Sequence, residues 1–350
     1  MKYNYCTLFD KGFLNRFIAL HDSFEKYHKV DYRHYVLCLD NETLDILTEM
    51  NLPHVIPVQR SDFESSELLE VKKTRSLREY SWTLSSVFTK YVLDHFENIE
   101  MVTYVDADLY FYDSPEIIFE AFERANASIL IIPHNLPSWK KQKEEAVGKY
   151  NVAFNIFRND ENGRACLNWW AESCIKWCYE IVEPSRFADQ KYLDYFEEKF
   201  NGVFVYTNKG ANLAPWNIKN FVGKIKEKHD SVYIDNDKLI FFHFSSFKLF
   251  FPKSFILPSS PVMGTYADYI LPSIERKLIY SPYTTALYKA MDKIRAVRPN
   301  FIFGTIPRPN FFIQIKDVVL PIIIDSIKTH IKKRLPFWII ERIKVARNKP

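Results

Sequence analysis

The sequence predicts an α/β fold, in which a mostly parallel sheet carries helices on both faces and a helical extension follows. Short apolar runs alternate with longer segments of helical spacing along the first half of the 350 residues, and this alternation is typical of parallel sheets. The share of hydrophobic residues, 47%, is that of a globular chain with a sizeable core. After residue 255 the pattern becomes helical and is broken by prolines. We therefore expect a domain over 1–258 and a C-terminal helical extension over 259–350.

The elements of the domain can be placed in order from the spacing of their apolar residues. Short apolar runs predict strands at 3–9, 35–39, 54–58, 101–105, 128–132, 154–158, 203–206 and 239–244. Apolar residues at helical spacing predict helices at 14–24, 42–50, 84–96, 116–124, 162–180 and 189–200. Ser114 can cap the helix at 116–124, with Pro115 in its first turn. Ligands of such sheets bind at the carboxyl ends of the strands, so residues that follow strands are the candidates for a site.

Composition excludes several classes of protein. The chain has only 8 glycines and contains neither a GxGxxG nor a GxxxxGK[ST] phosphate loop. The N-terminus lacks the apolar core of a signal peptide, and no apolar run reaches the roughly 20 residues of a membrane-spanning helix. We therefore expect a cytoplasmic protein. The cysteines match no zinc-site spacing and are predicted to be buried, reduced thiols: Cys6, Cys38, Cys166, Cys174 and Cys178.

Two aspartates directly after an apolar strand form the sharpest motif. The segment Tyr104-Val105-Asp106-Ala107-Asp108 ends the strand with two carboxylates separated by one small residue. In an extended backbone, residues i and i+2 point to the same side, so Asp106 and Asp108 can approach one cation. Mg²⁺ and Mn²⁺ prefer carboxylate oxygens and share their coordination shell with substrate phosphates. The alternative interpretation is a surface turn with two solvated aspartates, which their repulsion at the end of a buried strand disfavours.

In its context, the Asp106-Ala107-Asp108 element resembles the DxD motif of GT-A-fold glycosyltransferases. It is most similar to glycosyltransferase family 8, which includes glycogenin and bacterial lipopolysaccharide glycosyltransferases. The resemblance covers 3–250 and consists of several short motifs in the same order. It implies a GT-A, Rossmann-like fold, Mn²⁺ or Mg²⁺ held by Asp106 and Asp108, and a nucleotide-diphosphate sugar as donor. A UDP-sugar is the usual donor of the family.

The same resemblance marks residues on either side of this strand. In the family, a helix ahead of the DxD strand carries basic residues that approach the nucleotide phosphates, which implies Arg75 and Lys90 here. Each can equally be a solvated cation on a helix surface. The segment from Tyr150 to Asn155 resembles the FNxGV motif and implies that Asn151 contacts the sugar or the acceptor. Ala153 stands where the family has glycine.

Two adjacent residues further along resemble the catalytic motif of the family. The segment Phe187-Ala188-Asp189-Gln190-Lys191 resembles PDQD, with Lys191 in place of the second aspartate. The match implies that Asp189 and Gln190 lie near the anomeric carbon of the donor sugar. Asp189 can also be the N-cap of a helix, and the two roles are compatible.

The last motifs supply an aromatic residue, a metal ligand and a cation. Trp216 falls in a Trp–Asn pair that lines the acceptor side in the family, although a tryptophan more often packs in a core. The segment from Phe241 to Lys248 resembles HxxGxxK, which implies His243 as third metal ligand and Lys248 on the diphosphate. Ser246 replaces the glycine, and the spacing from histidine to lysine is one residue shorter here. A lone histidine in an apolar strand is usually a core residue, and the aspartate pair favours a ligand.

The C-terminal residues form a basic and aromatic segment. Residues 311–350 contain nine Lys or Arg and three Asp or Glu. The cations are interleaved with isoleucines, Phe337 and Trp338, which is typical of a segment that lies on a membrane surface. A helix packed on the domain is the alternative. Because no nucleic-acid motif accompanies the segment, we expect a membrane surface and no nucleic acid as its partner.

These observations predict a metal-dependent hexosyltransferase, peripheral on the inner face of the membrane. It would transfer a sugar from a nucleotide-diphosphate donor to a hydroxyl of a glycan or lipid-linked glycan, in polysaccharide or lipopolysaccharide synthesis. Family 8 implies retention of the anomeric configuration, and an inverting GT-A enzyme is the alternative. A haloacid-dehalogenase-type phosphatase with Asp106 as nucleophile is disfavoured by Tyr110, and a nucleotidyltransferase by the missing Gly-rich loop. A non-catalytic membrane-associated scaffold is kept open by Ala153, Lys191 and Ser246.

Overall fold

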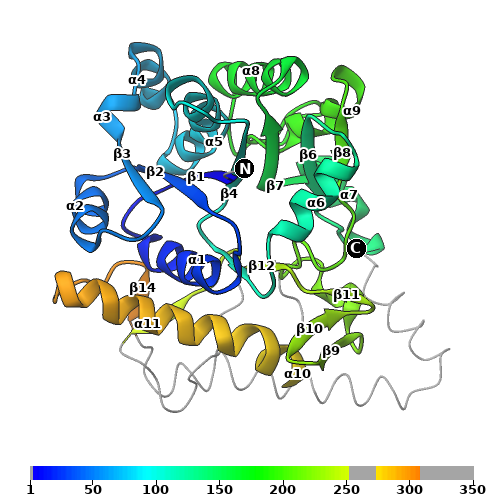
Figure 1. Cartoon of the computed structure of the whole chain (residues 1–350). Coiled ribbons are helices and arrows are strands. Elements are labelled where there is room, and N and C mark those ends of the chain that lie inside the picture. The colour runs from blue at the N-terminus through cyan, green and yellow to red at the C-terminus, as the bar shows by residue number, and fades with distance from the viewer. Residues whose placement is uncertain (1–2, 252–272, 308–350) are drawn as a thin grey trace, which may run out of the picture.

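A seven-stranded sheet organises the computed structural model, which describes residues 3–251 and 273–307 (Figure 1). The strand order is β3-β2-β1-β4-β7-β6-β8. In this sheet β7 runs antiparallel to β4 and β6, whereas the other neighbouring strands pair in parallel. The predicted α/β class with a mostly parallel sheet is confirmed. The strands are β1 (Tyr3–Phe9), β2 (Tyr32–Cys38), β3 (Val55–Gln59), β4 (Met101–Val105), β6 (Ile129–Pro133), β7 (Tyr150–Arg158) and β8 (Val203–Val205).

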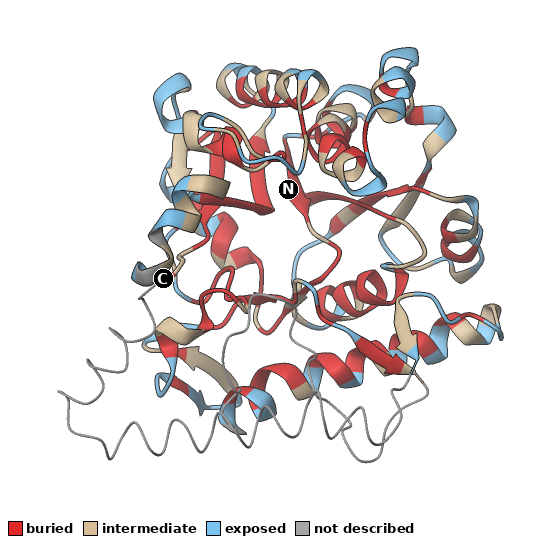
Figure 2. Ribbon diagram, turned by 180° about the vertical axis from the view of Figure 1, so that it is seen from behind, coloured by how far each residue is buried: buried red, intermediate tan, exposed pale blue. Residues whose placement is uncertain are grey.

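Helices cover both faces of the sheet, and each face has its own hydrophobic core (Figure 2). One core contains α4 (Ser66–Lys73), α5 (Leu77–His95), α8 (Glu161–Lys176) and α9 (Phe196–Lys199). The other contains α1 (Leu14–Tyr27), α2 (Asn41–Met50), α6 (Glu116–Arg124) and α11 (Ser281–Val297). Helical spacing explains this division, because each helix buries one apolar stripe against the sheet. In α5 the stripe is Tyr80, Leu84, Phe88 and Val92.

Smaller elements complete the domain at the edges of the sheet. β5 (Leu109–Phe111) pairs antiparallel with β12 (Phe241–His243), which carries a late segment of the chain to the end of β4. A three-stranded sheet follows the order β11-β10-β9. The remaining elements are α3 (Arg60–Phe63), η1 (Ser138–Lys140), α7 (Lys141–Val147), η2 (Lys191–Tyr195), η3 (Ile218–Phe221), β9 (Ile225–Lys228), β10 (Ser231–Ile234), β11 (Asp237–Lys238), β13 (Leu249–Phe251), α10 (Ser273–Glu275), η4 (Arg276–Tyr280) and β14 (Thr305–Pro307).

The described part of the C-terminal extension packs on the domain. α11 runs beside α1 (Figure 1) and contributes Tyr283, Leu287 and Ile294 to the core that α1 also enters. β14 pairs in parallel with β13, so the extension also joins the segment that follows Lys248. The predicted domain boundary at 258 and the basic segment 311–350 lie outside the described residues. Within the described ranges, no helix is both long enough and apolar enough to cross a bilayer.

Local predictions were confirmed in some places and wrong in others. Ser114 Oγ accepts a hydrogen bond from the Glu116 backbone N–H (3.2 Å) at the start of α6, as expected. All five cysteines are unpaired and buried. The helix expected over 189–200 is instead the 3₁₀ turn η2 followed by the short α9, and Gln190 precedes it. The predicted N-cap role of Asp189 is therefore wrong, because Gln190 is the N-cap residue of η2 and the Asp189 carboxylate accepts a hydrogen bond from Ser85 Oγ.

Candidate active site

The two aspartates of the DxD element lie in a turn at the carboxyl end of β4. Every residue of β4 is buried, and the Asp106 backbone N–H donates to the Ala153 carbonyl on the neighbouring β7 (3.0 Å). The Leu109 N–H then donates to the Asp106 carbonyl (3.2 Å), which closes the turn into β5. The extended geometry expected for this pair is wrong. A turn, held by the adjacent strand, directs both carboxylates to the same place.

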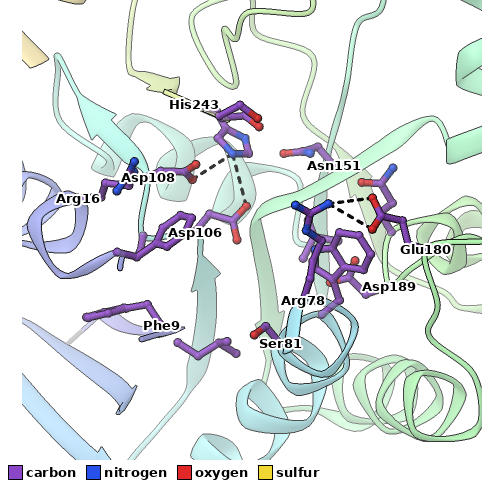
Figure 3. Close-up of a pocket in the computed structure, with 18 of the residues that line it drawn as sticks. Phe9, Arg16, Arg78, Ser81, Asp106, Asp108, Asn151, Glu180, Asp189 and His243 are labelled. Carbon is purple, nitrogen blue, oxygen red and sulfur yellow. Dashed lines mark hydrogen bonds and ion pairs between the residues drawn. The ribbon is translucent and has the colours of Figure 1, made fainter. Parts of the chain in front are cut away.

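His243 reaches these aspartates because β12 pairs with β5. In this register His243 lies opposite Leu109, and the Phe244 N–H donates to the Asp108 carbonyl (2.9 Å). The imidazole Nε2 lies 3.1 Å from Asp108 Oδ1 and 3.6 Å from Asp106 Oδ2 (Figure 3). One ligand atom from each of the three residues lies within 4.8 Å of the other two. The structure thus brings together the three residues that the sequence motifs marked as metal ligands.

The charges of this cluster are strongly coupled. Burial raises the pKa of Asp106 to about 6, against the opposing effect of His243. Burial acts in the same direction on Asp108, but His243 and then Arg16 outweigh it and lower the pKa of this carboxyl. Burial disfavours the charged form of His243, yet the neighbouring aspartates outweigh it and raise the pKa of the imidazole. Two carboxylates therefore share one imidazole, and the cluster carries an excess of negative charge in a buried place.

The donor set fits a divalent cation. Carboxylate oxygens and an imidazole nitrogen are ligands of Mn²⁺ and, for the oxygens, of Mg²⁺. A cation between the three side chains would compensate the excess charge that Asp106 and Asp108 bring. The other imidazole nitrogen, His243 Nδ1, is buried without a hydrogen-bond partner among the described residues. His243 is therefore oriented by its strand and by Trp216, whose ring meets it edge-on at 5.0 Å.

A cavity of about 960 Å³ opens beside this cluster. Its wall includes five residues that the sequence motifs assigned to substrate: Asn151, Asp189, Gln190, Trp216 and Lys248. They come from β7, from the segment before η2, from the segment before η3 and from the segment after β12. The structure thus gathers at one cavity residues that lie almost one hundred positions apart in the sequence.

Asp189 and Gln190 are held firmly in this wall. Asp189 is 5% exposed and accepts a hydrogen bond from Ser85 Oγ on α5 (2.7 Å). Burial raises the pKa of Asp189 to about 7, although the Ser85 hydrogen bond opposes the shift. Gln190 donates from Nε2 to the Val147 carbonyl at the end of α7 (2.7 Å), and its amide oxygen remains the group available to the cavity. The Asp189 carboxyl and the Gln190 amide are thus adjacent in sequence, and both line the cavity.

The backbone at two of these segments has left-handed geometry. Ala188 has a φ of 48° and Ser246 a φ of 60°, which costs free energy for residues other than glycine. Ala188 directly precedes Asp189, and Ser246 lies between His243 and Lys248. Residues in such conformations gather at functional sites, where the surrounding structure holds them. The glycine of the resembled HxxGxxK motif matches the geometry that Ser246 adopts.

The structure does not bring Arg75 or Lys90 to the cavity. Arg75 is 9% exposed and donates to Thr83 Oγ1 and to the Ile175 carbonyl, which joins α5 to α8. Lys90 pairs with Asp94 one turn further along α5. Neither residue is among those that line the cavity. Arg75 therefore joins two helices, and Lys90 is a cation on a helix surface.

Polar residues that line the cavity but that sequence reasoning missed include Arg16, Arg78 and His134. Arg78 projects from the first turn of α5 and pairs with Glu180, which also lines the cavity (2.9 Å; Figure 3). Helical spacing could have found it, because Arg78, Ser81 and Ser85 follow one face of α5. Arg16 donates to the Phe247 carbonyl (2.7 Å) and so holds the chain directly before Lys248. No local pattern marks Arg16 or His134.

Two uncharacterised proteins of Bacillus subtilis strain 168 are similar to this chain over most of their length. YfnD is 34% identical over 284 residues, which cover 80% of this chain and 88% of YfnD. YfnF is 34% identical over 251 residues, which cover 70% of this chain and 82% of YfnF. No protein-family model matches the sequence.

Several solved structures are similar to this chain at low identity. The galactosyltransferase LgtC, in complex with donor and acceptor sugar analogs, is 12% identical with a TM-score of 0.49, and the match covers 82% of this chain and 95% of LgtC. Mouse xyloside xylosyltransferase 1 is 12% identical with a TM-score of 0.46, and the match covers 70% of this chain and 98% of the xylosyltransferase chain. The glycosyltransferase GlyE of Streptococcus pneumoniae TIGR4 is 13% identical with a TM-score of 0.47, and the match covers 84% of this chain and 64% of the GlyE chain.

Proposed function

We propose that this chain, which belongs to the family of the Bacillus subtilis proteins YfnD and YfnF, is a metal-dependent glycosyltransferase with a nucleotide-diphosphate sugar as donor. The observation that carries the proposal is the convergence of Asp106, Asp108 and His243 at the wall of one cavity. The motifs that resemble glycosyltransferase family 8 support it, because residues from five such motifs line this cavity.

The residues of the cavity have complementary roles in this reaction. In the transfer, the bond between the anomeric carbon and the terminal phosphate oxygen breaks, and the acceptor oxygen bonds to that carbon. Mn²⁺ or Mg²⁺, held by Asp106, Asp108 and His243, would supply charge neutralisation for the leaving diphosphate. Lys248 and Arg78 also line the cavity, and their positive charges would bind the same phosphates. The hydroxyl proton of the acceptor passes to the departing diphosphate, which balances the reaction.

Other residues that line the same cavity would bind the sugar. The Asn151 amide nitrogen would donate a hydrogen bond to a sugar hydroxyl, the Gln190 amide oxygen would accept one, and Asp189 would lie beneath the ring. A neutral or half-ionised Asp189 near pH 7 is suited to a hydrogen bond with a hydroxyl, because its pKa is raised to about 7 by burial. Trp216 offers a ring edge beside His243 for the acceptor side. We propose a hexose donor, a uridine nucleotide and retention of configuration on the family 8 resemblance.

The acceptor and the cellular location rest on the sequence. We propose a hydroxyl of a cell-surface glycan or lipid-linked glycan as acceptor, and a membrane surface as partner of the basic segment 311–350. This segment lies outside the described residues, so the membrane proposal depends on its composition. Binding of the full chain to vesicles with and without anionic lipid, at rising ionic strength, tests it, because polybasic attachment weakens as salt screens the charges.

Hydrolysis of a panel of nucleotide sugars tests the main proposal. We expect slow release of one nucleotide that requires Mn²⁺ or Mg²⁺ and is lost in Asp108→Asn. Asp292→Asn is the matched control, because Asp292 is an exposed aspartate on α11. Absence of release and of metal-dependent nucleotide binding in the wild type would overturn the proposal in favour of a scaffold. Release of phosphate from simple monoesters would indicate a phosphatase.

A further inference from the structure

His134 follows β6 directly and lies in the cavity wall beside Asn151. It is 6% exposed, and its backbone is fixed from both sides. The His134 N–H donates to the Lys149 carbonyl (2.9 Å), and the His134 carbonyl accepts hydrogen bonds from Trp216 Nε1 (3.0 Å) and Asn217 Nδ2 (2.9 Å). None of the sequence motifs includes this histidine. These hydrogen bonds fix the position of His134 in the cavity wall. The proposed reaction assigns no role to its imidazole.

The hydrogen bonds of Asn151 fix the direction of its side-chain amide. The Ala153 backbone N–H donates to Asn151 Oδ1 (3.2 Å), and so the amide oxygen faces β7. The amide nitrogen Nδ2 then faces His134 Nε2 at 3.1 Å. An amide NH₂ group can only donate, so His134 Nε2 must carry the lone pair. The imidazole is therefore neutral, and its proton sits on Nδ1.

Burial of His134 favours the neutral ring, while the Nδ1 atom that then carries the proton is buried without a hydrogen-bond partner among the described residues. Burial lowers the pKa of the imidazole to about 4, although the nearby Lys149 carbonyl opposes the shift. A neutral ring keeps an acceptor at Nε2 throughout the physiological pH range. One of the two N–H groups of Asn151 is thus occupied by His134. The other belongs to a side chain that lines the cavity (Figure 3).

We infer that His134 is a positioning residue for the donor sugar: its neutral imidazole locks the Asn151 amide, so that the second N–H of this amide addresses a sugar hydroxyl. This inference rests on the proposed glycosyltransferase function. The network also reaches the metal cluster, because Ala153 binds the Asn151 side chain through its N–H and the Asp106 backbone N–H through its carbonyl. The sugar contact and the DxD turn are thereby set by the same residue of β7.

A double-mutant cycle in donor hydrolysis tests the inference. His134→Phe keeps the ring but removes the acceptor, and we expect kcat/KM to fall about 10-fold to 100-fold, as for residues that orient a ligand-binding group. His134→Gln returns an acceptor near the position of Nε2, and we expect kcat/KM to recover to within about 3-fold of the wild type. In the Asn151→Ala background, His134→Phe should change kcat/KM less than about 2-fold, because the group that it orients is gone. Additive effects of the two substitutions would overturn the inference.

A second measurement on the wild type needs neither activity nor a variant. Histidine ¹⁵N–¹H correlation spectra of the metal-free protein report which ring nitrogen of His134 carries the proton. We expect protonation of Nδ1 and a neutral ring down to about pH 5, given a pKa of about 4. A proton on Nε2 would contradict the inference even if the variants did not fold. If the wild type hydrolyses no nucleotide sugar, the proposed function fails, and the spectrum still decides the arrangement of His134.

Discussion

In the described part of the chain, the cluster around Glu116 and the cluster around Asp106 and Asp108 both combine carboxylate with histidine, and they differ in charge balance. In the first, Glu116 Oε1 accepts from the backbone N–H groups of Lys29 and Val30 (2.8 and 3.1 Å) and lies 2.7 Å from His28 Nδ1. The opposite nitrogen of His28 contacts the Tyr5 hydroxyl (2.9 Å). In the second, Asp106 and Asp108 share His243. The first cluster has one carboxylate for one imidazole and does not line the cavity, whereas the second has two and does.

The pKa values express the same difference. Burial would raise the pKa of Glu116, but hydrogen bonds from His28 and the Lys29 N–H outweigh it and lower the pKa to about 2. At the second cluster, burial raises the pKa of Asp106 to about 6. The protein thus stabilises the charge of Glu116 by itself and leaves Asp106 in need of a cation. Glu116, whose negative charge is stabilised by hydrogen bonds from the protein, has a structural role. A carboxylate such as Asp106, whose charge the protein does not balance, is a candidate ligand of a cation.

The largest expected effect of a substitution on stability is at Glu116. Glu116→Ala leaves His28 and two backbone N–H groups without their charged acceptor, and we expect unfolding by urea to become easier by about 2–4 kcal/mol. Donor hydrolysis per folded molecule should stay unchanged. Glu120→Ala on the same helix is the control, because Glu120 is in an exposed pair with Arg124. A loss at Glu116 no greater than at Glu120 would remove the distinction between the clusters.

The stabilisation by Glu116 should also depend on pH. Because the pKa of Glu116 is lowered in the folded state to about 2, the unfolded chain binds the proton first as pH falls. The stabilisation is therefore present above about pH 4.5, the range in which the unfolded carboxyl is ionised, and is lost as pH falls toward 2. Urea unfolding of wild type and Glu116→Ala at a series of pH values should show converging stabilities below pH 4.5. A constant difference would mean that the carboxylate charge contributes nothing.

The second cluster should respond in metal affinity. His243→Ala removes one of three ligands, and we expect Mn²⁺ to bind at least about 10-fold to 100-fold more weakly, with a parallel fall in donor hydrolysis. Titration calorimetry with Mn²⁺ alone measures the affinity. His95→Ala is the matched control, because His95 is an exposed histidine at the end of α5. Equal Mn²⁺ affinity of His243→Ala and wild type would exclude His243 as a ligand.

Asp189 is a third buried carboxyl, and its effect on the stability of the fold should depend on pH. Its pKa is raised by burial to about 7, so the folded state keeps its proton at pH values at which the unfolded chain has lost it. The wild type should therefore lose stability as pH rises from about 4 to 7, whereas Asp189→Asn should not. We expect Asp189→Asn to be more stable than wild type by about 1–2 kcal/mol at pH 8 with chelator present, and less active. Asp292→Asn serves as control, and an unchanged pH profile in Asp189→Asn would contradict the raised pKa.

Much of this arrangement could be predicted from the sequence, because local patterns encode it. Alternating strands and helices gave the α/β class, and the DxD element gave two metal ligands. The position of His243 could be inferred only through a resemblance, because the pairing of β12 with β5 joins segments that are far apart in sequence. The pairing of Glu116 with His28 could not be predicted at all, since it depends on how α1 and α6 pack against each other. Long-range packing, unlike strand or helix periodicity, leaves no local signal.

The basic residues at α5 also show that the sequence alone could not predict which of them lines the cavity. Arg75, Arg78 and Lys90 all lie at or near α5, and the resemblance fixed the helix but not the residue that faces the cavity. Arg78 lies on the face that also carries Ser81 and Ser85, and these line the cavity or contact Asp189. Arg75 precedes the helix and turns toward Ile175, and Lys90 lies beyond the reach of the cavity. The choice among the three depends on where the first turn of α5 begins, which the Ser76–Glu79 capping box sets.

The smallest expected effect separates Arg78 from Lys90. Lys90→Met removes an ion pair on a helix surface, and we expect a change in stability of no more than about 0.5 kcal/mol. The KM for the donor should stay unchanged, because Lys90 does not line the cavity. Arg78→Met is the matched comparison on the same helix, and its removal of a cation from the cavity should raise the KM for the donor about 10-fold. A larger effect of Lys90→Met than of Arg78→Met on the KM would mean that the donor phosphates lie on the other side of α5, away from the aspartate pair.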